Sequence, residues 1–152
     1  MHLAVAEGTD VVYVQKLEGR HGLPTASRVG GRMPAYCTGV GKALLAHAPS
    51  DRLAAVLDGG LLRRTPRTVV AAGLLHRELA RVRETGIAFE HEESTVGISC
   101  VASPVIDING EAVAAVSITG RANTIDTARL APAVRTAALG ISRSLGAETS
   151  RG

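Results

Sequence analysis

The chain of 152 residues has very few aromatic side chains: one Phe, two Tyr and no Trp. Proteins that bind single-stranded nucleic acid usually stack bases on aromatic rings, so this scarcity argues against that class despite the net charge of +3. The chain has two cysteines, Cys37 and Cys100, far apart and in no Cys-x-x-Cys pattern, which favours reduced thiols. No apolar run approaches the ~20 residues of a membrane span, and no signal-peptide core follows Met1. We therefore expect a cytoplasmic protein without a membrane partner.

Aliphatic residues are abundant instead. Hydrophobic residues make up 45% of the sequence, which suffices for the core of one domain built from Ala, Val, Leu and Ile. The apolar patterns predict strands at 2–6, 11–17, around 25–28, and at 87–92, 98–108 and 112–119. A Glu-Gly-Thr-Asp turn joins the first two strands, and Asn109-Gly110 is a strong signal for a hairpin between the last two.

Helices are predicted where apolar residues recur every three to four positions, at 38–47, 51–57, 71–85 and 127–145. Ser50 is the expected N-cap of the second helix, and Gly86 the expected stop of the third. Because hairpin-linked strands alternate with helices, the order of elements predicts an α+β domain with an antiparallel sheet.

The segment 32–46 combines a basic, proline-marked loop with two glycines, Gly39 and Gly41, that open an apolar helix. Unpaired N–H groups at such a start suit an anion, so we expect a small acidic molecule to bind there. A nucleotide-binding P-loop is excluded, because Tyr36 and Ala43 occupy positions that the motif reserves for Gly and Ser/Thr. Lys42 is predicted to lie in solvent.

Several motifs occur together in one order: VVYV (11–14), RMPA (32–35), TGVGKALL (38–45), RVRETG (81–86), EE (92–93), VGISCVASPV (96–105), AAVSITG (114–120) and ISRSLG (141–146). With these motifs, the chain resembles the effector-binding domain of IclR-type bacterial transcription regulators over essentially its whole length. The resemblance implies a GAF-like fold, in which helices flank a central antiparallel sheet.

The resemblance also implies a domain organisation. We expect an effector-binding domain at residues 1–147 and a disordered tail at 148–152. Members of the family carry a winged helix-turn-helix domain ahead of this one, and it is absent from this chain. The expected partners are a small organic acid and further copies of the chain in a homodimer or tetramer, with DNA bound only through the missing domain.

The resemblance further implies ligand-binding residues. The backbone N–H groups of Gly39 and Val40 would hold an effector carboxylate, and Cys100 would line the floor of the pocket. Ser117 and Thr119 would donate hydroxyl groups, and their spacing of two places them on one face of a strand.

Thr25 and Met33 fall where family members place side chains of the pocket wall, and Glu90 falls where Asp is common. Three departures from the family pattern are expected to reshape the pocket. Glu90 is longer than Asp, Val40 replaces a frequent Ala, and Thr25 makes the wall more polar.

Two other classes of function stay open on the residues alone: a hydrolase with Cys100 or Ser117 as nucleophile, and a purely structural dimerisation module. No Gly-x-Ser-x-Gly motif is present, and we expect no enzyme activity and no cofactor. Strand alternation would place Glu90 and Glu92 on one face and His91 and Glu93 on the other. None of these has a standard zinc spacing, so no metal site is expected.

Overall fold

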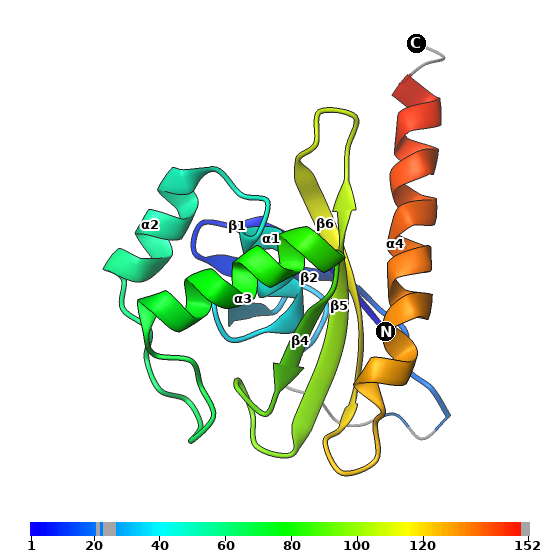
Figure 1. Cartoon of the computed structure of the whole chain (residues 1–152). Helices are drawn as coiled ribbons and strands as arrows, with labels where there is room; N and C mark the ends of the chain where they lie inside the picture. The colour runs from blue at the N-terminus through cyan, green and yellow to red at the C-terminus, as the bar shows by residue number, and fades with distance from the viewer. Residues whose placement is uncertain (21, 23–26, 150–152) are drawn as a thin grey trace.

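The computed structural model of the chain describes residues 1–20, 22 and 27–149. Its strands form one sheet in the order β3-β2-β1-β6-β5-β4, and every neighbouring pair is antiparallel (Figure 1). The strands are β1 (His2–Glu7), β2 (Asp10–Lys16), β3 (Arg32–Pro34), β4 (Ala88–His91), β5 (Ile98–Ile106) and β6 (Ala112–Arg121). The helices are α1 (Gly39–Leu45), α2 (Ser50–Asp58), α3 (Ala72–Thr85) and α4 (Thr127–Thr149). The predicted α+β class with an antiparallel sheet is confirmed.

Helices cover both faces of the sheet (Figure 1). On one face, Ala102 of β5 belongs to the same core cluster as the buried residues of α1 and α3. The preceding residue of β5, Val101, points to the opposite face and packs against Ala131 and Val134 of α4. Successive side chains of β5 therefore pack into the cores on opposite faces of the sheet, which explains why this strand is almost entirely buried.

The hairpin between β5 and β6 forms as the Asn-Gly signal predicts. Gly110 adopts a positive φ of 79°, which glycine accepts without strain. The side chain of Asp107 stabilises the turn, because its Oδ1 accepts the N–H groups of Asn109 and Glu111.

All seven residues of α1 are buried, and glycine makes this close packing possible. A Cβ added to Gly41 would lie 2.1 Å from the carbonyl oxygen of Ala35. Thr38 caps the helix, since its Oγ1 accepts the N–H of Gly41 at 3.2 Å. The start of α1 is thereby fixed against the sheet.

Two local predictions differ from the structure, and a third lies largely outside the described residues. The segment 32–34, interpreted as a loop, forms the edge strand β3, where Pro34 is tolerated because an edge strand needs no donor on its open side. The strand expected around 25–28 falls largely outside the described residues, and the described Ser27 and Arg28 are not in a strand. Ser50 does not cap α2: Pro49 occupies the N-cap position, without a side-chain hydrogen bond.

Candidate ligand-binding site

A cavity of about 70 Å³, here called the central cavity, lies between the start of α1 and the sheet. All six strands or the turns that follow them contribute to its wall. The lining residues are His2, Tyr13, Ser27, Met33, Thr38, Gly39, Val40, Glu90, Ser94, Thr95, Ile98, Cys100, Ser117 and Thr119. Polar and apolar side chains thus converge from segments far apart in the sequence.

The structure brings together most of the residues predicted to form a ligand site. Those that line the central cavity are Met33, Gly39, Val40, Glu90, Cys100, Ser117 and Thr119. Thr25 lies outside the described residues. The structure shows that these seven residues share one cavity, and their role in ligand binding stays a prediction.

Sheet register explains why the polar residues meet. Glu90 of β4 pairs with Cys100 of β5, and Cys100 pairs with Thr119 of β6, so these side chains form a row across the sheet. One step along, Ser117 of β6 pairs with His2 of β1. Because directly opposed residues point to the same face, both rows face the cavity.

His2 is a cavity residue that the sequence interpretation missed. Its Nε2 lies 2.8 Å from Oγ of Ser27, and its Nδ1 lies 3.5 Å from Oγ1 of Thr119. Burial, reinforced by the nearby N-terminal ammonium and Lys16, lowers the pKa of His2 to about 4, so the imidazole is neutral at pH 7. Alternation with Ala4, which is fully buried, was the one sequence signal that could have placed His2 on the inner face.

Glu90 is 3% exposed and anchors the loop that follows β4. Its Oε1 accepts the N–H groups of Glu93 at 2.8 Å and Ser94 at 3.1 Å, and the hydroxyl of Ser94 at 3.3 Å. Burial raises the pKa of Glu90 above its ordinary value, although the two N–H groups oppose this shift. The carboxyl group of Glu90 therefore holds the loop after β4 in place and is itself part of the cavity wall.

Cys100 is buried beside Glu90. Burial, followed by the charge of Glu90, raises the pKa of the Cys100 thiol well above its ordinary value. A thiol that stays protonated is a poor nucleophile, so this environment suits lining and not catalysis.

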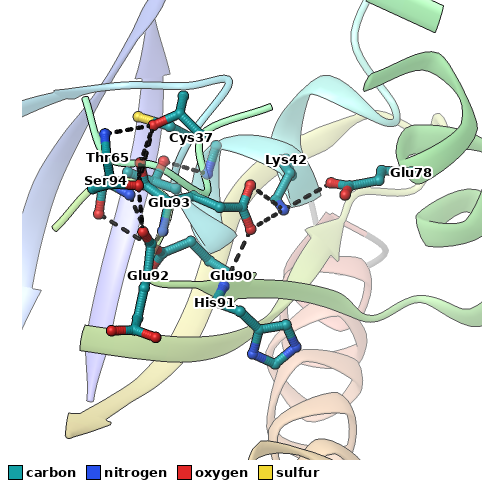
Figure 2. Close-up of polar contacts among 12 residues, drawn as sticks. Cys37, Lys42, Thr65, Glu78, Glu90, His91, Glu92, Glu93 and Ser94 are labelled. Carbon is teal, nitrogen blue, oxygen red and sulfur yellow. Dashed lines mark hydrogen bonds and ion pairs between the residues drawn. The ribbon is translucent and has the colours of Figure 1, made fainter. Parts of the chain in front are cut away.

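The prediction that Lys42 lies in solvent is wrong. Its side chain is 2% exposed, and Nζ lies 2.9 Å from Oε2 of Glu78 and 2.9 Å from Oε2 of Glu93 (Figure 2). Burial alone would lower the pKa of Lys42, but both carboxylates and their hydrogen bonds outweigh it and raise that pKa. The lysine is charged and paired, which is the usual condition for burying one.

Glu93 and the residues around it depart from the predicted alternation. Strand β4 ends at His91, and Glu92 turns the chain with a positive φ of 55°. Glu93 is therefore directed inward to Lys42, and its Oε2 also accepts the N–H of His91. The hydroxyl of Thr65 donates to the carbonyl oxygen of Glu92 (Figure 2). The hydroxyl of Thr68 donates to the carbonyl oxygen of Glu93, and the two bonds fix the loop.

A second cavity of about 170 Å³ is lined by Lys42, Glu78, Arg81, Val82, Ile87, Phe89, His91 and Glu93. Its three central charged groups, those of Lys42, Glu78 and Glu93, already pair with one another. Among the residues that the structure describes, no group of three or more His, Cys, Asp or Glu could hold a metal ion.

Replacing Gly39 by alanine is expected to lower the free energy of unfolding by about 1–3 kcal/mol through overpacking. The new Cβ would lie 2.5 Å from Sγ of Cys100 and 3.4 Å from Cβ of Ala102. Removal of the sulfur in a Gly39→Ala/Cys100→Ala double variant should recover part of the loss. Urea unfolding of the two single variants and the double variant measures this coupling. Equal costs for Gly39→Ala with and without the sulfur would contradict the assigned clash.

Comparisons with known proteins agree with this architecture. The family model described as "Bacterial transcriptional regulator IclR C-terminal" matches residues 1–143. The HTH-type transcriptional regulator XynR of Escherichia coli is 36% identical over 149 residues, which cover 95% of this chain and 59% of XynR. The crystal structure of Thermotoga maritima IclR matches with a TM-score of 0.89 and 37% identity, covering 95% of this chain and 60% of that one. An IclR homologue from Microbacterium hydrocarbonoxydans, complexed with 4-hydroxybenzoate, matches with a TM-score of 0.87 and 28% identity, covering 95% and 59%.

The chain shares its helix-flanked antiparallel sheet with these regulators. The chain belongs to the IclR family of bacterial transcriptional regulators, in which it corresponds to the C-terminal domain. It spans 59% of XynR, somewhat more than half of that relative's length. The family consists of transcriptional regulators and not of enzymes, so the hydrolase alternative for Cys100 and Ser117 is set aside.

None of the described helices is both long enough and apolar enough to cross a membrane.

Proposed function

We propose that this domain binds a small organic acid in the central cavity. In a longer protein, such binding would alter the DNA affinity of a separate DNA-binding domain. The observation that carries the proposal is the convergence of Ser117, Thr119 and His2 with the backbone of Gly39 and Val40 on one buried cavity. Hydroxyl and backbone N–H groups are the donors that a buried carboxylate needs.

The donors at α1 are fewer than the sequence suggested. The N–H of Gly41 donates to Oγ1 of Thr38. Those of Gly39 and Val40 lie nearest the cavity, and since the N–H of Gly39 already bonds to the sulfur of Cys100, a ligand would share or displace that bond. The hydroxyls of Ser117 and Thr119 complement them from the opposite wall. An acid held between the helix start and the sheet would touch both.

The size of the cavity limits the ligand. An engineered cavity of about 150 Å³ holds the six heavy atoms of benzene, so about 70 Å³ has room for roughly three heavy atoms. The relative from M. hydrocarbonoxydans is complexed with 4-hydroxybenzoate, an aromatic acid. That complex supports a carboxylic acid as the ligand class, and the smaller volume here favours a short aliphatic acid.

A thermal-shift screen tests the proposal. The probes are acetate, propionate, butyrate and 4-hydroxybenzoate, and the controls are the neutral amides of the three aliphatic acids. A ligand at 100 times its Kd stabilises the folded state by about 2.7 kcal/mol, so at least one acid should raise Tm while its amide does not. Shifts by amides alone would contradict an anion site.

Ser117→Ala is expected to weaken binding of the responding acid by roughly 1–3 kcal/mol, the usual cost of losing a hydrogen bond to a charged group. Isothermal titration calorimetry measures the change. Ser144→Ala on α4 is the matched control, because Ser144 is exposed and bonds only within its own helix. Equal Kd values for the two variants would place the ligand away from Ser117.

We also propose that the domain self-associates in the bacterial cytoplasm as a homodimer or tetramer. The support is a pair of exposed apolar side chains one turn apart on α4, Ile141 and Leu145. Light scattering should give at least twice the monomer mass. A monomer mass at every accessible concentration would contradict self-association of this domain.

A further inference from the structure

Glu90 is a buried carboxyl group with no cation of its own. Among the described residues, none of the ion pairs includes Glu90. Lys42, the lysine nearest to this loop, donates instead to Glu78 and Glu93. Glu90 instead accepts bonds from neutral groups: the N–H groups and hydroxyl of the following loop donate to Oε1, and the Cys100 thiol also donates to the carboxyl group.

The other titratable groups around Glu90 add no net compensating charge, because the attraction of Lys42 is opposed by the repulsion of Glu93. They come from β1, β2, the segment before α1, α1 itself, the loop after β4, and β5: His2, Tyr13, Cys37, Lys42, Glu93 and Cys100. Burial raises the pKa values of Tyr13 and Cys100, which keeps both groups neutral. His2 is neutral at pH 7 because its pKa is about 4, and the charge of Lys42 is matched by Glu78 and Glu93.

A ligand carboxylate in this cavity would therefore meet the Glu90 carboxyl group without a free cation between them. Two carboxylates that share a desolvated site are not both ionised, since each disfavours the charge of the other. In about 70 Å³ the two groups have no room to separate.

We propose that an organic acid anion enters the central cavity together with one proton, which Glu90 holds while the ligand is bound. The inference rests on the proposed function and adds to it a rule for the charge state of the site. The proton comes from solvent or buffer. Because Oε1 accepts the N–H groups of the loop, the proton resides on Oε2, which then donates to an oxygen of the ligand carboxylate.

The direction of the pH dependence follows from linkage. Below the pKa of Glu90 in the free protein the proton is already bound, and the Kd does not change with pH. Above that pKa each bound anion takes up one proton, so the Kd rises about tenfold for each pH unit. Burial, which raises the pKa of Glu90, moves this change toward neutral pH.

Calorimetry on the domain tests the inference between about pH 6 and about pH 8.5. The probe is the acid that gives the largest shift among acetate, propionate, butyrate and 4-hydroxybenzoate, titrated at each pH in two buffers of different ionisation enthalpy. For the wild type, we expect proton uptake that approaches one per ligand at the alkaline end. In Glu90→Gln the side-chain amide is neutral at every pH and can both donate and accept a hydrogen bond, so the Kd of this variant should not vary with pH. At the alkaline end it should bind the acid more tightly than the wild type does.

The variant His2→Gln tests whether His2, and not Glu90, takes up the proton, because a bound anion would also favour protonation of the His2 imidazole. This variant should keep the proton uptake even where its affinity falls. Uptake lost in His2→Gln and kept in Glu90→Gln would overturn the inference, as would a wild-type Kd that is constant over the whole pH range. Loss of binding in Glu90→Gln would also overturn it, because the ligand would then require the ionised carboxylate. If none of the four acids binds, the proposed function fails, whereas binding without proton uptake refutes only this inference.

Discussion

Replacing Lys42 by methionine should lower the free energy of unfolding by about 3–5 kcal/mol, as expected when one partner of a buried ion pair is removed. The substitution keeps the apolar stem but leaves the carboxylate of Glu93, which is 5% exposed, without its cation. Glu78 is less affected because its side chain is 41% exposed, so solvent partly replaces the lost cation. Urea unfolding followed by circular dichroism measures the change.

The control is Lys16→Met, at the only other lysine of the chain. Lys16 pairs with the exposed Glu18 and donates to the carbonyl oxygen of Ser27, so its loss should cost about 1 kcal/mol. A Lys42→Met/Glu93→Gln double variant should recover part of the larger loss, because no unpaired buried carboxylate remains. Wild-type stability in Lys42→Met would mean that the ion pair contributes nothing to the fold.

Replacing Gly41 by alanine should abolish folding. The added Cβ would lie 2.1 Å from the carbonyl oxygen of Ala35 and 2.4 Å from its Cα. Both atoms belong to the backbone, so no rotamer change relieves the overlap, and α1 would have to leave the sheet.

Gly73→Ala is the matched control for Gly41→Ala. Gly73 lies in α3, and a Cβ added there would meet nothing within 4 Å. Alanine should therefore stabilise the protein by up to about 1 kcal/mol through its better helix propensity. Soluble expression, circular dichroism and Tm compare the two variants. A folded Gly41→Ala domain with near-native Tm would contradict the close packing of α1.

Local patterns in the sequence predicted most of the fold. Asn109-Gly110 fixed a hairpin, and Gly86 ends α3 in the left-handed conformation as expected, with a φ of 73°. The strand β3 was missed because its three residues include Pro34, and only pairing with β2 makes them a strand. Such pairing joins segments that local patterns do not connect.

In the candidate site, too, local patterns predicted some positions and missed those that depend on contacts between distant segments. Strand alternation correctly predicted that Ser117 and Thr119 point to one side, where the structure finds the central cavity. The burial of Lys42 could not be predicted, because its partner Glu93 lies 51 residues away and is turned inward by a positive φ at Glu92. His2 was overlooked because its partners, Ser27 and Thr119, come from distant parts of the chain.

A crystal structure of the domain with the acid that gives the largest thermal shift tests the central claim most directly. The account predicts the ligand carboxylate in the central cavity, within about 3.2 Å of the hydroxyl groups of Ser117 and Thr119 or of the N–H groups of Gly39 and Val40. Density for the acid in the second cavity beside Arg81 and His91, with the central cavity free of ligand, would contradict it.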